Sequence, residues 1–398
     1  MRKLVFALIL LFAIELQAET HFVHADGKFL VDAEGHKLIL RGTNLGNWLV
    51  PEGYMFRFEG GPQSAREIEA MVNELIGPTE AAKFWHQYRE LYITRKDIDF
   101  IARSGFNTIR IPFHYKFFVP GDDEGFMLLD RVLQWAKEDG LYVILDMHCA
   151  PGGQTGANID DSWGYPWLYE DEASQQQAAD IWKRIASHYQ SNPTVIGYDL
   201  LNEPIPHYPR LQQYNSKLEP VYKNLVAAVR SVDKNHVVIL GGAQWDSNFS
   251  VFGPPFDKNV MYTFHKYWMP PVQDAVNPYV AFRDKYNVPI WMGESGENTD
   301  EWINQFRKLL EVNEISWTFW PYKKMEANSA PVTFARPEHW DAIVAYAARH
   351  AGMGDTEKSV AARPPLEDCR AAFEDLLTKI RFENAAPNRS YLDALAAK

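Results

Sequence analysis

The sequence predicts an α/β protein built as a (β/α)8 TIM barrel. Short β-rich runs alternate with amphipathic helical segments along most of the chain. These runs are continuously apolar rather than alternating, which is typical of parallel strands buried on both faces. About eight strand–helix units fit within the 398 residues, and eight such units close a barrel.

A doubly wound parallel sheet is the competing architecture. That fold places a glycine-rich, phosphate-binding turn of the form GxGxxG after its first strand. Gly42 and Gly46 lie near the first long strand candidate but do not have this spacing. The barrel is therefore the favoured fold.

The first 18 residues have the features of a signal peptide. Arg2 and Lys3 supply a basic start, and residues 4–14 are apolar. Residues 16–18 then precede a suitable cleavage point. The apolar run is short for a bilayer span, although an uncleaved anchor is the alternative. We expect an extracytoplasmic protein, secreted or periplasmic, that is free of the membrane after cleavage.

An N-terminal hairpin is expected directly after this leader. Residues 22–32 contain two short apolar runs around Asp26-Gly27, a dipeptide that favours tight hairpin turns. Residues 37–44 form the first long strand candidate, and helices are expected at 64–75 and 78–91.

The strand–helix alternation starts at residue 94. Strands are expected at 107–112, 141–148, 195–203, 237–240, 260–267, 289–294 and 315–320, and helices at 94–103, 126–138, 173–189, 214–232, 276–286, 301–312 and 340–349. We assign residues 19–350 to the barrel domain. Residues 351–398 should add a C-terminal helix, at 366–380, and a tail that packs on the outside of the barrel.

Composition limits the classes of partner. A net charge of −12 without a long Lys/Arg run argues against nucleic acid, because phosphate neutralisation needs clustered cations. Cys149 and Cys369 are too few and too distant for a disulfide framework or a zinc site, so both are expected to be free. Aromatic residues make up 14% of the chain, and flat rings suit the apolar faces of sugars, although large cores also bury many rings.

Two glutamates carry the functional hypothesis. Glu203 ends one predicted strand and Glu294 ends another. Catalytic groups of barrel enzymes lie at the C-terminal ends of the strands, and glycoside hydrolysis uses a pair of carboxyl groups. We therefore predict that Glu203 is the general acid/base and Glu294 the nucleophile.

Other polar and aromatic side chains fall at the ends of the remaining strands. They are Arg110, Asp146, His148, Asn202, His265, Tyr267 and Trp320. Arg110 is either a structural ion-pair partner or the group that keeps Glu294 ionised. Asp146 and His148 share one face, but no third ligand follows at a useful spacing, so no metal is expected.

In this order, these residues resemble the motifs of glycoside hydrolase family 5, whose members are (β/α)8 barrels. The matching positions are Arg110, His148, 202–204, 265–267, Glu294 and Trp320. The similarity extends over about residues 38–322, which makes 19–350 the catalytic domain. It implies double displacement with retained configuration, no cofactor, and catalytic carboxyl groups about 5–5.5 Å apart.

Within this family, the chain is most similar to exo-β-1,3-glucanases. Residues 41–50 and 146–154 are similar to their first-strand and third-strand motifs. Glu52 falls where those enzymes bind the terminal sugar. Asn47 and Cys149 stand where the family usually has glycine, and both lie in substrate loops.

The same resemblance implies that the surrounding residues bind substrate or support the nucleophile. These residues are Glu52, Arg110, His148, Asn202, His265, Tyr267 and Trp320. Arg110 and Tyr267 are placed to stabilise Glu294, and Trp320 to form a platform beneath the sugar. The two histidines and Asn202 should bind hydroxyl groups of the reacting sugar.

The expected protein is a monomeric, retaining β-glycosidase that hydrolyses β-glucans or β-glucosides. An endo-β-1,4-glucanase is the main alternative, because exo action needs loops that block one end of the site. Residues 51–91 and 151–172 are long enough to do so. A non-catalytic carbohydrate-binding barrel conflicts with the presence of both glutamates. A metal-dependent hydrolase, using Asp146, His148 and His265, would lose activity in EDTA.

Overall fold

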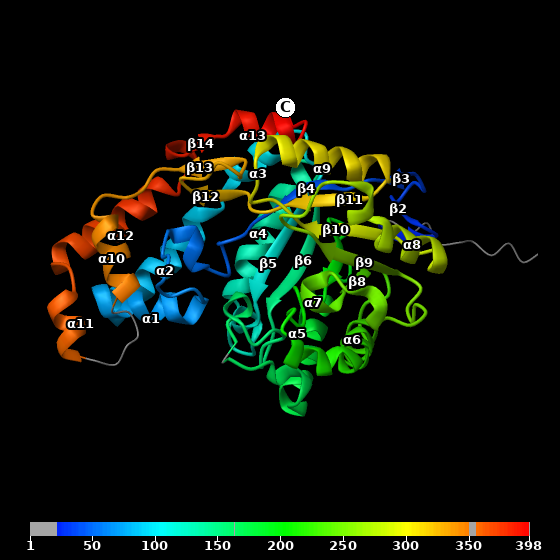
Figure 1. Cartoon of the computed structure of the whole chain (residues 1–398), viewed down its shortest axis with the longest axis horizontal. Coiled ribbons are helices and arrows are strands. Elements are labelled where there is room, and N and C mark those ends of the chain that lie inside the picture. The colour runs from blue at the N-terminus through cyan, green and yellow to red at the C-terminus, as the bar shows by residue number, and fades with distance from the viewer. Residues whose placement is uncertain (1–21, 163, 350–355, 398) are drawn as a thin grey trace, which may run out of the picture.

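The computed structural model describes residues 22–162, 164–349 and 356–397 (Figure 1). Within these residues, eight parallel strands close into a barrel in the order β10-β11-β4-β5-β6-β7-β8-β9. They are β4 (Arg41–Asn44), β5 (Thr108–His114), β6 (Tyr142–Cys149), β7 (Val195–Asp199), β8 (Val237–Gly241), β9 (Val260–His265), β10 (Ile290–Glu294) and β11 (Ser316–Phe319). The predicted (β/α)8 barrel is confirmed. The predicted signal peptide at 1–18 lies outside the described residues.

Helices connect the strands and cover the outside of the barrel (Figure 1). They are α3 (Arg95–Arg103), α4 (Glu124–Glu138), α5 (Glu172–Tyr189), α6 (Asn215–Arg230), α8 (Asn277–Tyr286) and α9 (Asp300–Val312). The short segment α7 (Ala243–Asp246) follows β8 and is not a regular helix, because Gln244 and Trp245 have non-helical dihedral angles. Capping residues stabilise the N-termini of several of these helices. Thr94 and Asp97 form a capping box at α3, and the Asp171 side chain accepts a hydrogen bond from Ser174 N at α5.

The N-terminal hairpin closes the bottom of the barrel. Strands β1 (His24–Asp26) and β2 (Phe29–Val31) pair antiparallel, as predicted, and β3 (Lys37–Leu38) adds to them. The predicted strand 37–44 is therefore wrong as a single element. Its first part pairs with β2, whereas its second part runs parallel between β11 and β5 as β4.

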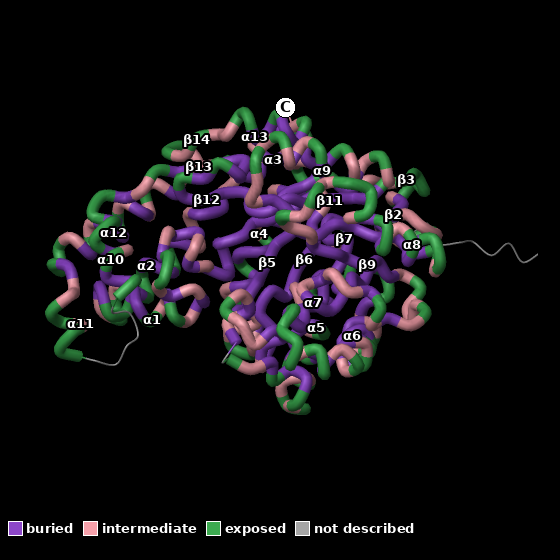
Figure 2. Tube along the Cα trace, in the orientation of Figure 1, coloured by how far each residue is buried: buried purple, intermediate pink, exposed green. Residues whose placement is uncertain are grey.

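The interior of the barrel changes from apolar to polar along its strands. At the N-terminal end, hairpin residues Val23 and Leu30 share one core cluster with barrel residues such as Trp291. Nearer the C-terminal end, Arg110 and Asp146 are fully buried. Figure 2 shows the barrel strands mostly buried, with exposed residues mostly on the outer helices and loops. Buried charges therefore lie just below the C-terminal ends of the strands.

A helical lobe lies beside the barrel (Figure 1). It consists of α1 (Ala65–Ile76), α2 (Pro78–Tyr92), α10 (Trp340–Arg349), α11 (Thr356–Ala362) and α12 (Leu366–Lys379). The C-terminal helix α12 packs on α1 and α2, and Phe373 contacts Phe84 with ring centroids 5.0 Å apart. The predicted helix at 366–380 thus contacts the insertion that follows β4.

The remaining C-terminal residues contain more structure than the predicted tail. Strand β14 (Ala386–Pro387) pairs with β13 (Val332–Phe334), which also pairs with β12 (Lys323–Met325). Helix α13 (Arg389–Ala394) packs on α9. No helix among the described residues is long and apolar enough to cross a membrane.

Candidate active site

A cavity of about 720 Å³ opens at the C-terminal end of the barrel, within the range of about 300–1,000 Å³ typical of ligand sites. The predicted site residues that line it are Glu52, His148, Glu203, His265, Tyr267, Glu294 and Trp320. Arg110 and Asn202 do not line it and are buried among the strands below. Arg110 contacts both Glu294 and Asn202 there, and the predicted contact of Arg110 and Asn202 with substrate stays a prediction.

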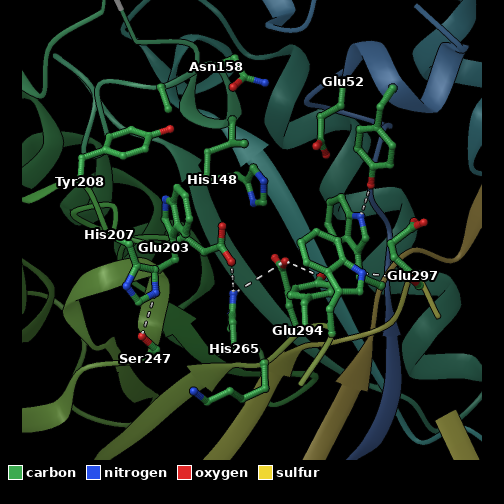
Figure 3. A pocket seen from close by; sticks show the side chains of 18 residues that line it. Glu52, His148, Asn158, Glu203, His207, Tyr208, Ser247, His265, Glu294 and Glu297 are labelled. Atoms are coloured by element: carbon green, nitrogen blue, oxygen red, sulfur yellow. Dashed lines mark hydrogen bonds and ion pairs between the residues drawn. The ribbon is translucent and has the colours of Figure 1, made fainter. Parts of the chain in front are cut away.

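Glu203 and Glu294 approach each other across this cavity, with His265 between them (Figure 3). One carboxylate oxygen of Glu203 lies within 4.8 Å of one carboxylate oxygen of Glu294. Glu294 ends β10 beside a break in the strand register. The predicted strand 195–203 is too long, because β7 ends at Asp199 and Glu203 has φ of 45° in the following loop.

Both carboxylate oxygens of Glu294 receive a hydrogen bond. Arg110 donates through Nη1 to Oε1, and the Tyr267 hydroxyl donates to Oε2 over 3.1 Å. Burial, together with the nearby carboxylates, raises the pKa of Tyr267 well above its ordinary value, so the hydroxyl stays protonated. Two fixed donors thus stabilise negative charge on Glu294.

Arg110 is the centre of a buried network that includes one residue not predicted from the sequence. Its guanidinium lies 2.9 Å from Asp199 Oδ2 and 3.1 Å from Asp146 Oδ2, in addition to its contact with Glu294. Burial raises the pKa of both aspartates to about 7. The residue not predicted is Asp199; it is a lone carboxylate in the apolar run of β7, which is the one sequence feature that could have indicated it.

The surroundings of Glu203 are different. Its carboxylate Oε1 lies 3.0 Å from His265 Nδ1, and its backbone N–H donates to Asp246 Oδ2 over 3.1 Å. Burial raises the pKa of Glu203 and lowers that of His265 to about 3. The imidazole is therefore neutral, and no cation lies in direct contact with the Glu203 carboxyl group in the described residues.

His148 and Trp320 form a flat wall of the cavity. Their rings are nearly parallel, at 6° with centroids 5.6 Å apart. His148 Nδ1 lies 2.8 Å from Asp146 Oδ2, and burial lowers the pKa of His148 to about 4. Trp320 Nε1 donates to the hydroxyl of Tyr54 over 2.7 Å. This arrangement leaves a neutral imidazole and an indole face toward a ligand.

Glu52 reaches the cavity from the loop after β4. Burial raises its pKa well above the ordinary range, and its Oε1 has no hydrogen-bond partner among the described residues. The Asn47 side chain accepts a hydrogen bond from Glu52 N over 2.9 Å. Asn47 itself has φ of 63°, a conformation that asparagine adopts more readily than most residues, so it fits a glycine position.

Asp146, His148 and Glu294 each present an atom within 4.8 Å of the other two. The third group of this set comes from β10, a contact between distant strands that spacing along the sequence does not indicate. However, Arg110 already contacts Asp146 Oδ2 and Glu294 Oε1, so a cation of the protein itself occupies this position. That the protein needs no metal or other cofactor stays a prediction.

The other lining residues were not predicted as site residues, although Lys266 lies within the matched motif 265–267. They are Tyr54, Ala157, Asn158, Ile159, His207, Tyr208, Trp245, Ser247, Lys266, Trp268 and Glu297. They come from loops and short helical turns beyond the strand ends, where no periodic pattern exists to place them. Trp268 is 71% exposed, and its indole N–H donates to the carbonyl of Glu297 over 3.1 Å.

The chain is similar to known glycosidases. A family model described as cellulase (glycosyl hydrolase family 5) matches residues 69–326. A beta-xylosidase of Phanerodontia chrysosporium is 29% identical over 348 residues, which cover 76% of this chain and 71% of that protein. Glucan 1,3-beta-glucosidase 2 of Wickerhamomyces anomalus is 30% identical over 246 residues, which cover 57% of this chain and 56% of that protein.

The fold is also found among solved structures. The crystal structure of rutinosidase from Aspergillus niger aligns with a TM-score of 0.58 at 19% identity, over 72% of this chain and 90% of that chain. The family model covers most of the barrel and includes both glutamates that meet in the cavity. The chain therefore belongs to glycosyl hydrolase family 5, the cellulase family, and is a glycoside hydrolase.

Proposed function

We propose that the protein is a retaining exo-β-glycosidase that releases sugars from the ends of β-glucans or from β-glucosides. The observation that carries this proposal is the approach of Glu203 and Glu294 to within 4.8 Å, oxygen to oxygen. Retaining enzymes hold these groups about 5–5.5 Å apart, whereas inverting enzymes leave about 6.5–9.5 Å for a water molecule.

In the first step, Glu294 attacks the anomeric carbon and Glu203 protonates the departing oxygen. Glu294 suits the nucleophile's role because Arg110 and Tyr267 both donate to it and hold its orientation. Glu203 suits the acid's role because burial raises its pKa, so it retains a proton to donate. A covalent glycosyl–Glu294 intermediate results.

In the second step, Glu203 acts as a base. Having lost its proton, it accepts one from water as that water attacks the anomeric carbon, and Glu294 leaves as a carboxylate. The donors on Glu294 stabilise the charge that returns to it. His148 and Trp320, at the cavity wall, are placed to contact the sugar held between the glutamates.

Exo action on a β-glucan is supported by the loops and by one relative. The unpartnered carboxyl oxygen of Glu52 is suited to binding a hydroxyl group of a terminal sugar. Loops 51–91 and 151–172 both reach the cavity, through Tyr54 and Asn158 among others. One relative is named a glucan 1,3-beta-glucosidase. An endo-β-1,4-glucanase is the second candidate, since the family description is cellulase.

We also propose that the protein is exported and acts as a monomer. The basic and apolar start of the chain supports export to the periplasm or the medium. N-terminal sequencing of the mature protein should find a new terminus close to residue 19. Size-exclusion chromatography with light scattering should give a single species near 45.8 kDa, less the leader.

The test compares wild type with Glu203→Ala and Glu294→Ala on aryl β-glycosides and on β-1,3- and β-1,4-glucans. Wild type should release the β-anomer first, as seen by proton NMR during the first minutes. Glu294→Ala should be inactive, and added azide should yield an α-glycosyl azide. Glu203→Ala should keep kcat/KM on activated aryl glycosides but turn over slowly, because the second step lacks its base; azide should restore turnover and yield a β-glycosyl azide.

The matched control is Glu367→Ala on the exposed face of α12, which should behave as wild type. Initial release of the α-anomer would overturn the retaining mechanism. Loss of wild-type activity in EDTA would favour a metal-dependent hydrolase. Release of long oligosaccharides, with little monosaccharide, would favour the endo-glucanase.

A further inference from the structure

We propose that Asp246 controls the protonation of Glu203, because these two carboxyl groups share one proton through the ring of His265. The inference rests on the proposed role of Glu203 as acid/base. It makes Asp246 a positioning residue, since it acts on the substrate only through His265 and Glu203. Residues 241–246 showed no pattern in the sequence that would single out this carboxylate.

Asp246 is held in the barrel by an unusual turn after β8. Gln244, Trp245 and Asp246 have φ values of 54°, 54° and 60°, so three successive residues other than glycine are left-handed. Each such residue is costly, and the conformation persists only where its surroundings fix it. Here, Trp245 N donates to Ile205 O over 3.2 Å, and the Gln244 side chain hydrogen-bonds to its neighbours.

This turn places a fully buried carboxyl group against the acid/base. Asp246 Oδ2 accepts a hydrogen bond from Glu203 N over 3.1 Å and lies 3.3 Å from His265 Nε2. The other ring nitrogen, Nδ1, lies 3.0 Å from Glu203 Oε1. Asp246 Oδ1 has no hydrogen-bond partner among the described residues and lies close to Gly241.

The Asp246 carboxyl group has little freedom to turn away. A Cβ atom added at Gly241 would lie 1.8 Å from Oδ1, so glycine is needed at that position for the carboxyl group to fit. One ring nitrogen of His265, Nδ1, contacts Glu203 Oε1. The other, Nε2, has no hydrogen-bond partner among the described residues, and the Asp246 carboxyl group lies 3.3 Å from it.

The ionisation preferences of Glu203, His265 and Asp246, which together we call the proton-sharing unit, favour one proton shared between the two carboxyl groups. Burial lowers the pKa of His265 to about 3, so its ring is neutral and carries one N–H. Burial raises the pKa of Glu203 and, well above its ordinary range, that of Asp246. One additional proton therefore belongs to the two carboxyl groups together, as in other coupled pairs.

The proton can reach Glu203 without charging the ring. A proton leaves Asp246 Oδ2 for His265 Nε2 while the proton on Nδ1 leaves for Glu203 Oε1, so the imidazole remains neutral throughout. After Glu203 has protonated the leaving group, the unit retains a single proton between two carboxylates. Their mutual repulsion makes Glu203 a stronger base toward water in the second step.

Other ionisable groups set the background of the proton-sharing unit. Those that face Asp246 are Asp199, Arg110, Tyr169, Tyr222 and Tyr279. Those that face Glu203 and His265 are Glu294, His148, His207 and again Arg110. Asp199 opposes ionisation of Asp246 and Arg110 favours it. The tyrosines stay neutral in the working pH range, because burial raises the pKa of each.

The experiment measures the pH dependence of kcat/KM for wild type and Asp246→Asn. The alkaline limb of the kcat/KM–pH profile, where activity falls as Glu203 loses its proton, reports the pKa of Glu203. Loss of the ionisable partner should lower the proton affinity of Glu203, so this limb should move to lower pH by about one unit or more. At the pH of the wild-type limb, phenyl glycosides should be hydrolysed about tenfold more slowly. Dinitrophenyl glycosides should change about threefold or less, because their leaving group needs no acid.

A purely structural role for Asp246 makes a different prediction. Both substrates would then slow equally and the limb would not move, which would overturn the proposal. Asp233→Asn is the matched control, since Asp233 pairs with His236 in another buried Asp–His contact away from the cavity. It should leave the alkaline limb in place.

A second measurement uses wild type only, in case Asp246→Asn does not fold. With 15N-labelled histidine, assigned with His265→Gln, the Nε2 shift of His265 should titrate with the midpoint of the alkaline limb. A constant shift through that limb would refute proton sharing. Glu203→Ala separates the two hypotheses: full activity in that variant would refute the acid/base role itself, whereas an unmoved limb in Asp246→Asn refutes only the sharing.

Discussion

Asp199→Asn should change the pH dependence of stability in a way that follows from burial. Asp199 is fully buried on β7, and its Oδ2 lies 2.9 Å from Arg110. Burial raises its pKa from 3.8 to about 7, despite the neighbouring guanidinium. Asparagine has nearly the same shape and keeps an oxygen for Arg110, but it does not titrate.

The sign of the effect follows from proton linkage. Between pH 3.8 and about 7, the folded protein holds a proton on Asp199 that the unfolded chain has released. The contribution of Asp199 to the free energy of unfolding therefore falls as pH rises through this range. The shift corresponds to at most about 4 kcal/mol, since one pKa unit is about 1.36 kcal/mol. Asp199→Asn should thus gain stability relative to wild type, by up to that amount, from pH 4 to pH 7.

The dependence of the wild-type free energy of unfolding on pH does not, by itself, test this reasoning. His148 and His265 have pKa values lowered to about 4 and about 3, so the unfolded chain binds more protons at these sites. Their contribution to stability rises with pH over a similar range and offsets that of the buried aspartates. The histidine contribution cancels when the free energy of unfolding of wild type is subtracted from that of the variant at each pH.

The assay is urea unfolding followed by tryptophan fluorescence at half-unit steps from pH 4 to pH 7.5. Asp257→Asn is the control. Although partial burial opposes the shift, Arg230 lowers the pKa of Asp257, and a guanidinium does not titrate, so this stabilisation is complete above about pH 5. The control should lose stability equally at each pH above about 5. A variant-minus-wild-type difference for Asp199→Asn that is flat, or that falls with pH, would refute the reasoning.

Three further substitutions test the site. Tyr267→Phe removes a hydrogen bond to charged Glu294, worth about 1.5–3 kcal/mol, so kcat/KM should fall about ten- to a hundredfold while the melting temperature stays near that of wild type. Gly293→Ala should cost about 1–3 kcal/mol in thermal unfolding, because its Cβ would lie 2.8 Å from His265 Nε2; an unchanged melting temperature would contradict this. Trp320→Ala should raise KM more than it lowers kcat in steady-state assays, since the indole lines the cavity but transfers no proton.

Much of the fold was predictable because the signals are local. Continuous apolar runs bounded by turn residues predicted the barrel strands, and the helices expected at 94–103 and 173–189 agree with α3 and α5 to within a few positions. Glu203 and Glu294 were predictable because each ends an apolar run, and parallel strands bring their C-terminal ends together. These inferences need no knowledge of which distant residues touch.

What was missed depends on distant contacts or irregular backbone. The helical lobe joins residues 65–92 to residues 340–379, and amphipathic helices show that a partner exists but not which one. The strand 37–44 divides because its two halves pair with different sheets. Asp246 enters the site only through three left-handed residues, a conformation for which its sequence gives no signal.

The two catalytic carboxyl groups are chemically identical, so their different roles must come from their surroundings. Glu294 receives donors at both oxygens, one of them the buried guanidinium of Arg110, which stabilises the anion. Glu203 instead faces a neutral imidazole with a second carboxyl group behind it, which disfavours the anion. Replacing each glutamate by glutamine should therefore affect activity differently. Glu294→Gln removes the nucleophile for every substrate. Glu203→Gln should spare kcat/KM for substrates whose leaving group departs without a proton, while hydrolysis of the glycosyl–Glu294 intermediate slows for all of them.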